Sequence, residues 1–465
     1  MKDKWVKLPP SGVFKNALCD LAESYSGDFG SSLFYSGGEV DSSQGSYLCL
    51  FPSDFFSVSP TSFKTSQKEF SYDPLKVNPW ELIKEKVGDL NNPSKETIPL
   101  WVGYLSYEMG AYSHLYKFLS YHTPSVPLAY FVQPTLIIKQ NKEGDCFYCI
   151  RHKNLPGLSK DSQNILSQFL SERNLRCLMK KKAEIETKNK EEIKLTSKFC
   201  RLNYADKFSA IKKLLSQGDL YQVNLSEPFI FEGTFYPFEI FKKLIHRNPS
   251  SFSAYLNFDS LSLVSSSPER FVLKNGEQLE VRPVKGTIKR GVTLEEDKAL
   301  KEELISSKKD QAELLMIIDL LRNDLSKVSL PGSVKVNEFR RIESYENVYH
   351  ALSIIQSKAK SSIHPVDIVR EVYPGGSITG CPKIRSMQAI YDLEKCPRGI
   401  YTGSIGYFSS NGDFDFNIAI RTLSFEKEKA LARFGGAIVM DSILEKEIEE
   451  ILVKGSSIFS VMKEV

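Results

Sequence analysis

The carboxyl-terminal part of the chain, from about residue 198, alternates segments of helical and strand periodicity without a regular strand–helix–strand order. In 310–325 (DQAELLMIIDLLRNDL), apolar residues recur at three- and four-residue spacing, which is typical of a half-buried helix. The same reasoning predicts helices at 205–216, 295–326, 365–372, 384–393 and 443–454, and strands at 261–266, 270–274, 278–282, 404–409, 415–424 and 430–440. Because doubly wound parallel sheets need regular alternation, the pattern favours the α+β class.

Three stretches of the 465 residues differ in composition. Residues 1–150 carry short apolar runs broken by Ser, Gly and Pro, which predict strands joined by turns. Residues 151–197 are polar and rich in Lys, which is typical of a solvated helix or a linker. Residues 198–465 carry the alternating pattern and form the predicted catalytic region. These boundaries mark composition, so strands of the first stretch can share sheets with strands of the third.

The charge balance gives no electrostatic case for a nucleic-acid partner. Lys and Arg number 61 against 57 Asp and Glu, which leaves a formal net charge of +4 spread along the chain. The longest apolar runs, such as Leu314–Ile318, are far shorter than the roughly 20 residues of a membrane helix. The first residues contain no apolar stretch of signal-peptide length. We therefore expect a cytoplasmic protein with neither a nucleic-acid nor a membrane partner.

Two charged residues lie at the ends of neighbouring predicted strands. Glu269 follows Pro268 at the break between two strands, and Lys285 lies in Val281–Thr287, where the next strand ends. Solvated turns are the commoner place for Glu and Lys. The alternative is that both side chains face one cleft, as catalytic groups do. The sequence pattern leaves both interpretations open.

Carboxylates on two predicted helices are candidate metal ligands. Glu313 lies beside the apolar face of its helix, and Glu447 and Glu450 are three residues apart, so one helix face can present both. Carboxylates drawn from two helices are common ligands of Mg²⁺, which prefers oxygen. The alternative is plain surface acidity.

Two glycine clusters lie where a core pattern does not require them. Pro374–Lys383 precedes a predicted helix, and its N–H groups and hydroxyls suit an anion. Phe434–Ala437 interrupts a predicted strand, as happens where a ligand approaches the backbone closely. Neither cluster has the spacing of a nucleotide-binding motif. Together with the carboxylates, these features indicate a Mg²⁺-assisted enzyme that acts on a small polyanion.

A series of segments carries a family resemblance through its order along the chain. The segments are Gly218–Leu225, Ser267–Phe271, Arg282–Thr287, Lys309–Met316, Asp319–Asp324, Val348–His350, Pro374–Lys383, Gly403–Phe408, Ile420–Thr422, and Asp441–Ser442 with Glu450, with a looser match at Trp101–Glu108. In this order the chain resembles the chorismate-utilising enzymes, the family of anthranilate, aminodeoxychorismate, isochorismate and salicylate synthases. The resemblance implies a single interleaved α+β unit of four layers, with two antiparallel β-sheets face to face, helices outside and the active site between the sheets.

Two positions indicate a branch of the family. The site matching Gln222 is typically a water-activating Lys in isochorismate and salicylate synthases, and a neutral amide cannot act as that base. Lys285, within Pro-x-Lys-Gly-Thr, matches a lysine of the aminodeoxychorismate synthases at a site where anthranilate synthases typically have Ala. The resemblance therefore favours amination of chorismate on the route to 4-aminobenzoate and folate. The alternatives are anthranilate formation and a non-catalytic chorismate-binding scaffold.

The resemblance also implies a covalent mechanism. Neutral Lys285 would attack carbon 2 of chorismate as the hydroxyl leaves carbon 4, and ammonia would then enter at carbon 4 and expel the lysine. Desolvation or a nearby cation would favour the neutral amine. Glu269 would act as acid for the hydroxyl and as base for ammonia, with His350 beside the ring. A separate glutamine amidotransferase subunit would supply the ammonia.

The remaining roles follow from the same resemblance. Glu313 and Glu450, with Glu447 on the same helix face, would hold Mg²⁺, which grips the ring carboxylate. Tyr407 and Arg421 would bind the enolpyruvyl carboxylate. The predicted substrate-binding residues are Gln222, Ser377, Thr379, Tyr407, Arg421, Gly435, Gly436, Ala437 and Lys454.

Overall fold

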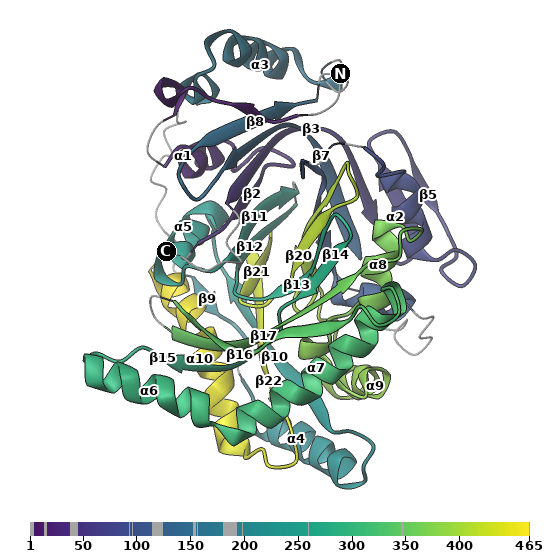
Figure 1. Cartoon of the computed structure of the whole chain (residues 1–465), viewed down its shortest axis with the longest axis vertical. Helices are drawn as coiled ribbons and strands as arrows, with labels where there is room; N and C mark the ends of the chain where they lie inside the picture. Colours follow the sequence, from purple (N-terminus) through teal and green to yellow (C-terminus); the bar gives the residue numbers. More distant parts are fainter. Residues whose placement is uncertain are drawn as a thin grey trace.

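The computed structural model consists of a β-sheet network with helices on its outside (Figure 1). It describes residues 4–13, 16–37, 45–92, 94, 96–113, 124–151, 155, 157–179, 193–197, 199–258, 260–345 and 348–464. Within these residues, 22 strands join into one hydrogen-bonded network. Its centre is the long antiparallel pair of β3 (Ser46–Val58) and β7 (Ala129–Gln140), from which two arms extend.

The first arm runs from β7 to the strands that carry the predicted nucleophile. Its strands, each antiparallel to the next, are β6 (Pro99–Leu105), β19 (Ser404–Ser409), β20 (Phe414–Asn417), β13 (Arg270–Asn275), β14 (Gln278–Val281) and β17 (Val348–Lys358). At its end, β17 also pairs with β15 (Val284–Lys289) and β16 (Lys335–Ser344).

The second arm runs from β3 to the strand with the late glycine cluster. Its strands, again antiparallel, are β2 (Ser32–Tyr35), β11 (Phe252–Phe258), β12 (Leu261–Ser267), β21 (Thr422–Glu426), β22 (Lys429–Ile438) and β10 (Gln222–Glu232). Short strands β9 (Lys194–Leu195) and β18 (Gly380–Cys381) pair with β10, while β1 (Val6–Lys7), β8 (Cys146–Ile150), β4 (Ser62–Thr65) and β5 (Glu69–Ser71) extend the β3–β7 centre.

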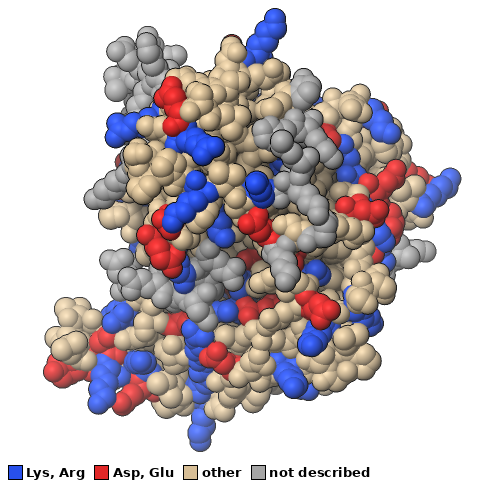
Figure 2. All heavy atoms as spheres, turned by 45° about the horizontal axis from the view of Figure 1, so that its top comes forward, with Lys and Arg blue, Asp and Glu red and all other residues tan. Residues whose placement is uncertain are grey.

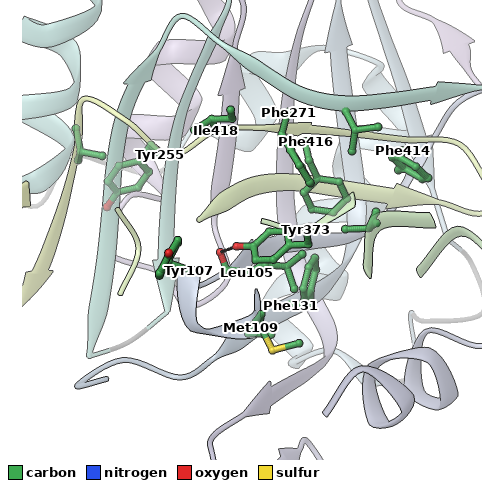
Figure 3. Close-up of a cluster of buried hydrophobic side chains, with 14 of the residues drawn as sticks. Leu105, Tyr107, Met109, Phe131, Tyr255, Phe271, Tyr373, Phe414, Phe416 and Ile418 are labelled. Carbon is green, nitrogen blue, oxygen red and sulfur yellow. Dashed lines mark hydrogen bonds between the residues drawn. The ribbon is translucent and has the colours of Figure 1, made fainter. Parts of the chain in front are cut away.

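The two arms face each other across a buried apolar core. Leu256 and Leu263 of the second arm lie in one hydrophobic cluster with Tyr104 and Ile405 of the first. In a larger cluster, Figure 3 shows the hydroxyl of Tyr373 donating to the carbonyl of Leu105. The predicted α+β class with face-to-face antiparallel sheets and outer helices is therefore confirmed, and the two sheets are arms of one network.

The helices cover the outside of both arms (Figure 1). They are α1 (Ala17–Ser24), α2 (Pro79–Val87), α3 (Lys160–Glu172), α4 (Arg201–Ser216), α5 (Pro237–Arg247), α6 (Leu294–Ser306), α7 (Lys308–Val328), α8 (Pro365–Val372), α9 (Lys383–Glu394) and α10 (Leu444–Lys463), with short 3₁₀ turns η1 (Pro10–Gly12), η2 (Tyr107–Tyr112), η5 (Leu175–Leu178) and η6 (Gly376–Ile378). No helix of the described residues is long and apolar enough to span a membrane.

Some predicted elements are wrong in their extent, and the helix predicted at 443–454, for example, continues as α10 to Lys463. The single helix predicted at 295–326 is two helices, because Ser307 has an extended backbone and its hydroxyl caps α7 by accepting a hydrogen bond from the Asp310 N–H. The strand predicted at 415–424 is interrupted between β20 and β21, where Arg421 adopts a left-handed φ of 50°. The helix predicted at 365–372 has the bounds of α8.

The composition boundaries do not separate the strands of the network. β2 of the first stretch pairs with β11, and β6 pairs with β19, so both arms contain strands of the first and third stretches. Residues 180–192 of the predicted linker lie outside the described residues. The space-filling view in Figure 2 shows positive and negative side chains interspersed on one face.

Candidate active site

Two predicted site residues lie where the chain crosses from one arm to the other. Glu269 lies between β12 of the second arm and β13 of the first. Arg421 lies between β20 of the first arm and β21 of the second. The two crossings run side by side, because the Ile418 N–H donates to the Glu269 carbonyl at 3.0 Å. Catalytic groups at such crossings can face the space between the sheets.

Glu269 is a buried carboxyl group with a raised pKa. It is 5% exposed, and Ser377 of η6 donates a hydrogen bond of 2.7 Å to its Oε1. Burial raises the pKa of Glu269 to about 7, although Ser377, the Val284 N–H and Lys285 each oppose that rise. At neutral pH this group is therefore present in both forms and can give or take a proton.

A β-bulge directs Lys285 away from the regular strand. On β15, Val284 pairs with Leu352 and Thr287 with His350, so two residues of β15 stand opposite one residue of β17. The second bulged residue, Gly286, has φ of 100°, which residues with a side chain rarely adopt. The Gly after Lys285 therefore allows the bend that re-aims the lysine.

Lys285 is paired with the first predicted metal ligand. Its Nζ lies 2.7 Å from Oε2 of Glu313 on α7. Burial alone lowers the pKa of Lys285, but the Glu313 carboxylate raises it above its ordinary value. Glu450 and Glu447 act in the same direction. In this structure the carboxylates, rather than desolvation, decide the charge of the amine, so it is an ammonium group. The neutral amine that the resemblance implies for the attack on the substrate stays a prediction.

The other predicted metal ligands lie on α10 above the late glycine cluster. A Cβ added at Gly436 would lie 3.0 Å from Oε2 of Glu447 and 3.3 Å from Oε1 of Glu450, so glycine makes room for both carboxylates. Lys454 binds Oε1 of Glu450 at 2.6 Å and the carbonyl of Gly435 at 3.0 Å. The close packing around Gly436 explains why β22 carries small residues at this point.

The donor chemistry around Lys285 suits a hard cation. Glu313, Glu447 and Glu450 all act electrostatically on the same amine, and carboxylate oxygens are the ligands that Mg²⁺ prefers. Within the described part of the chain, no three His, Cys, Asp or Glu side chains are gathered closely enough to form a metal site. Because Lys285 and Lys454 bind two of these carboxylates, magnesium stays a prediction.

His350 and Arg421 line one small pocket, together with Asn248, Tyr345 and Pro268. The Nδ1 of His350 lies 2.7 Å from the Thr287 hydroxyl. Burial first, and then the charge of Arg421, lowers the pKa of His350 to about 3, so its ring is neutral at physiological pH. The Arg421 guanidinium donates a hydrogen bond of 3.3 Å to the amide oxygen of Asn248. This cation therefore suits an anionic ligand.

Gln222 of β10 lies close to the turn that carries Ser377 and Thr379, because β10 pairs with β18, which directly follows that turn. Gln222 is 2% exposed, and within the described residues its Oε1 accepts no hydrogen bond. The Thr379 hydroxyl donates to the carbonyls of Gly375 and Gly376, so it stabilises its own turn. Ser377 likewise holds Glu269 rather than an anion.

The glycine cluster of β22 belongs to the β-ladder with β10. Gly435, Gly436 and Ala437 lie opposite Ser226, Leu225 and Asn224 in that order. A Cβ at Gly435 would lie 2.3 Å from the Leu225 carbonyl, which only glycine avoids. The small residues thus allow close strand approach as well as room for the carboxylates.

Tyr407 is not brought to the other predicted residues. Its ring packs at 5.6 Å from Tyr47 and 5.9 Å from Phe34, and it lines a different pocket together with Ser253 and Asn417. The sequence paired Tyr407 with Arg421, but the pocket with Arg421 contains no Tyr407. A motif identifies a strand, but it does not show which face of the strand each side chain occupies.

Tyr401 is a site residue that the sequence reasoning missed. It is 6% exposed, its ring lies 5.7 Å from the Arg398 guanidinium, and burial raises its pKa to about 12. Glu450 is among the charged groups that act on it, so it lies toward the carboxylates. The sequence did offer a signal for Tyr401. It lies two residues before Gly403, the first residue of the matched segment Gly403–Phe408.

The fold and the site define a class of protein that the sequence comparison also finds. The model of the chorismate binding enzyme family matches residues 51–460, so the chain belongs to this family. The family resemblance read from the ordered segments is confirmed.

Individual relatives divide between two activities. The chain is 38% identical over 351 residues to aminodeoxychorismate synthase component 1 of Bacillus subtilis (strain 168), covering 75% of this chain and 74% of the relative. It is 40% identical over 269 residues to anthranilate synthase component 1 of Aquifex aeolicus (strain VF5), covering 57% of this chain and 54% of that one. Anthranilate synthase component I from Streptococcus pneumoniae TIGR4 has a similar structure, with a TM-score of 0.75 and 26% identity over 90% of this chain and 93% of that chain.

Proposed function

We propose that the chain is an aminodeoxychorismate synthase component that converts chorismate and ammonia into 4-amino-4-deoxychorismate. The observation that carries this proposal is the half-buried amine of Lys285 on a β-bulge, within electrostatic reach of the Glu269 carboxyl. An amine at this position supplies a nucleophile that direct amination lacks. The likeness to the Bacillus subtilis component supports the same assignment.

Lys285 is the proposed nucleophile of a double displacement. The amine must first lose a proton, and the nearest base is the Glu313 carboxylate at 2.7 Å. It then attacks carbon 2 of chorismate while the hydroxyl leaves carbon 4. Ammonia enters carbon 4 in the second step and releases the lysine, so that the configuration at carbon 4 is retained.

Glu269 is the proposed acid and base of both steps. Because its pKa is about 7, the protonated form can protonate the departing hydroxyl, which leaves as water. The resulting carboxylate can then remove a proton from the ammonia that attacks. Ser377 holds Oε1 of Glu269 during both steps through its hydrogen bond of 2.7 Å.

Arg421, and a Mg²⁺ ion held by carboxylates of α7 and α10, would bind the two carboxylates of the substrate. Arg421 would bind the enolpyruvyl carboxylate, since it lines the pocket beside His350. Glu313, Glu447 and Glu450 would hold Mg²⁺, which, when bound, would offset their charge and grip the ring carboxylate. Gln222, a neutral amide, leaves ammonia rather than water as the nucleophile to be activated.

The experiment is product identification. The purified chain is incubated with chorismate, Mg²⁺ and ammonium, and the product is separated by chromatography. We expect aminodeoxychorismate without release of pyruvate. Anthranilate with pyruvate would establish the second candidate, anthranilate synthase, which the likeness to the Aquifex aeolicus protein favours. If neither product forms, the remaining alternative is a non-catalytic chorismate-binding scaffold.

We propose that a separate glutamine amidotransferase subunit supplies the ammonia. The relatives are named as component 1, which implies a second component. The chain should therefore use ammonium but not glutamine. Equal turnover of glutamine by the purified chain would contradict this partnership. The product would feed the synthesis of 4-aminobenzoate and folate.

A further inference from the structure

A buried ionic network lies behind the candidate site. Arg398, between α9 and β19, is 1% exposed and donates all five of its N–H groups. Two reach the carboxylate of Glu394, at 3.0 and 2.7 Å. The other three reach the carbonyl of Asn224 at 2.7 Å, the carbonyl of Ile378 at 3.1 Å and the hydroxyl of Thr402 at 3.2 Å.

The carboxylate at the centre of this network is fully occupied as well. Glu394 accepts two bonds from Arg398 and one of 2.8 Å from Arg433 of β22. The N–H and the hydroxyl of Ser226 on β10 donate to its Oε1, each at 2.9 Å. A buried ion pair whose donors and acceptors are all satisfied holds one geometry, because any displacement exposes an unpaired charge.

Two of the Arg398 contacts lie close in the chain to residues of the proposed site. Ile378 follows Ser377, which donates to Glu269. Asn224 lies two residues after Gln222 on β10, and its N–H donates to the Thr379 carbonyl at 2.8 Å. One guanidinium therefore ties the turn of Ser377 to the strand of Gln222.

We propose that Arg398 is a positioning residue that fixes Ser377 against Glu269, an inference that rests on the proposed function. Arg398 touches no reacting atom. It acts because its planar fork spans the Asn224 and Ile378 carbonyls at once, which a lysine with three donors on one nitrogen cannot do. Loss of the fork lets the η6 turn move, and Ser377 then no longer holds Glu269 in place.

The test uses the full-length chain with Arg398→Lys and a matched control. Arg151 is also buried, at 4% exposure, and its side chain donates to the carbonyls of Pro134 and Pro99, away from the site. Arg151→Lys should lower stability but leave catalysis unchanged. Arg398→Lys should lower kcat by roughly tenfold or more, because small misplacement of a catalytic group costs rate steeply. The alkaline limb of its kcat profile should also move to higher pH, because Glu269 enters the reaction as the protonated acid and the Ser377 bond lowers its pKa.

A double-mutant cycle identifies the route of the effect. If Arg398 acts through Ser377, then Arg398→Lys costs much less in a Ser377→Ala background than in the wild type. Additive losses, or an Arg398→Lys variant that loses stability alone as Arg151→Lys does, would overturn the inference. If Arg398→Lys does not fold, Thr402→Val can replace it, because it removes a single acceptor of Arg398. Thr402→Val should move the same limb of the kcat profile to higher pH, by a smaller amount. An unshifted limb would contradict the inference.

A second readout does not depend on turnover. Hydrogen–deuterium exchange of the intact chain should be faster in Arg398→Lys than in Arg151→Lys over residues 222–226 and 375–380. If the wild type turns over no chorismate, the proposed function fails, and this exchange result alone decides whether Arg398 fixes the turn. Unchanged exchange in both segments would overturn the positioning role.

Discussion

Burial of Glu269 predicts that the proposed catalytic carboxyl destabilises the fold above neutral pH. The pKa of Glu269 is raised by burial from 4.5 to about 7, while the unfolded chain keeps the lower value. Between these pH values the folded chain binds more protons, so stability falls as pH rises through this window. A difference of about 2.5 pH units at 1.36 kcal/mol each amounts to about 3 kcal/mol, and this cost is complete above pH 7.

Glu269→Gln should remove that cost. The variant should have no chorismate turnover, yet at pH 8.5 it should be more stable than the wild type by up to about 3 kcal/mol. At pH 4.5 the two proteins should differ little, because the wild-type carboxyl is then protonated in the folded state. Urea denaturation of the metal-free proteins measures the difference in unfolding free energy between the wild type and Glu269→Gln at each pH.

Glu394→Gln is the control of opposite sign. Burial favours a higher pKa for Glu394, but Arg398 and Arg433 overcome it and hold the pKa below its ordinary value. This carboxylate therefore stabilises the fold above its unfolded pKa, and its contribution is lost as pH falls. Glu394→Gln should destabilise at pH 8.5 and less so in acid. The reasoning about Glu269 is refuted if the wild type is the more stable protein at pH 8.5, or if its gap to Glu269→Gln is the same at both pH values.

Three further substitutions and one titration have defined outcomes. Lys285→Ala should abolish the substrate-linked protein seen by intact-mass spectrometry, and an adduct that persists would place the nucleophile elsewhere. Ser377→Ala removes a hydrogen bond to a charged carboxylate worth about 1.5–3 kcal/mol, so the alkaline limb of kcat, where the acid Glu269 loses its proton, should rise by about 1 to 2 pH units. Gly436→Ala adds a Cβ 3.0 Å from a carboxylate oxygen and should raise the Mg²⁺ concentration for half-maximal activity, whereas Gly27→Ala, with open space around it, should not. Because its pKa is about 3, the His350 imidazole should show no NMR titration between pH 5 and 8, and a midpoint in that range would contradict its burial.

Local patterns in the sequence predicted elements better than their connections. Helix α8 was recovered because its apolar spacing and its Pro at the first turn are local signals. The break at Ser307 was missed, because the helical pattern continues on both sides of a cap that depends on one hydroxyl. The pairing of β6 with β19 joins segments about 300 residues apart, which no local pattern contains, and only the family resemblance supplied the sheet arrangement.

In the site, the sequence likewise identified residues better than it identified the groups that they contact. The sequence singled out Glu269 and Lys285 as exceptions to strand composition, and the structure places both beside the β15 bulge. Ser377 was chosen as an anion-loop residue, but its hydroxyl binds a carboxyl 108 positions away. Tyr407 was chosen from its motif, but the alternation of strand faces directs it into a different pocket.

Buried polar groups of this fold fall into two kinds, and the difference indicates where a ligand belongs. Arg398 and Glu394 satisfy each other and every neighbouring donor, so adding a ligand there would break existing bonds. Glu269, Gln222 and Arg421 are different. Burial raises the pKa of Glu269, the amide oxygen of Gln222 accepts no hydrogen bond within the described residues, and burial lowers the pKa of Arg421. Each of these three groups bears a desolvation cost that a bound anion or amine could offset, whereas a purely structural core would have replaced them with apolar residues at lower cost. Two of the three groups, Glu269 and Arg421, lie where the chain crosses from one arm to the other, and this argues for chemistry at the crossings rather than for a scaffold.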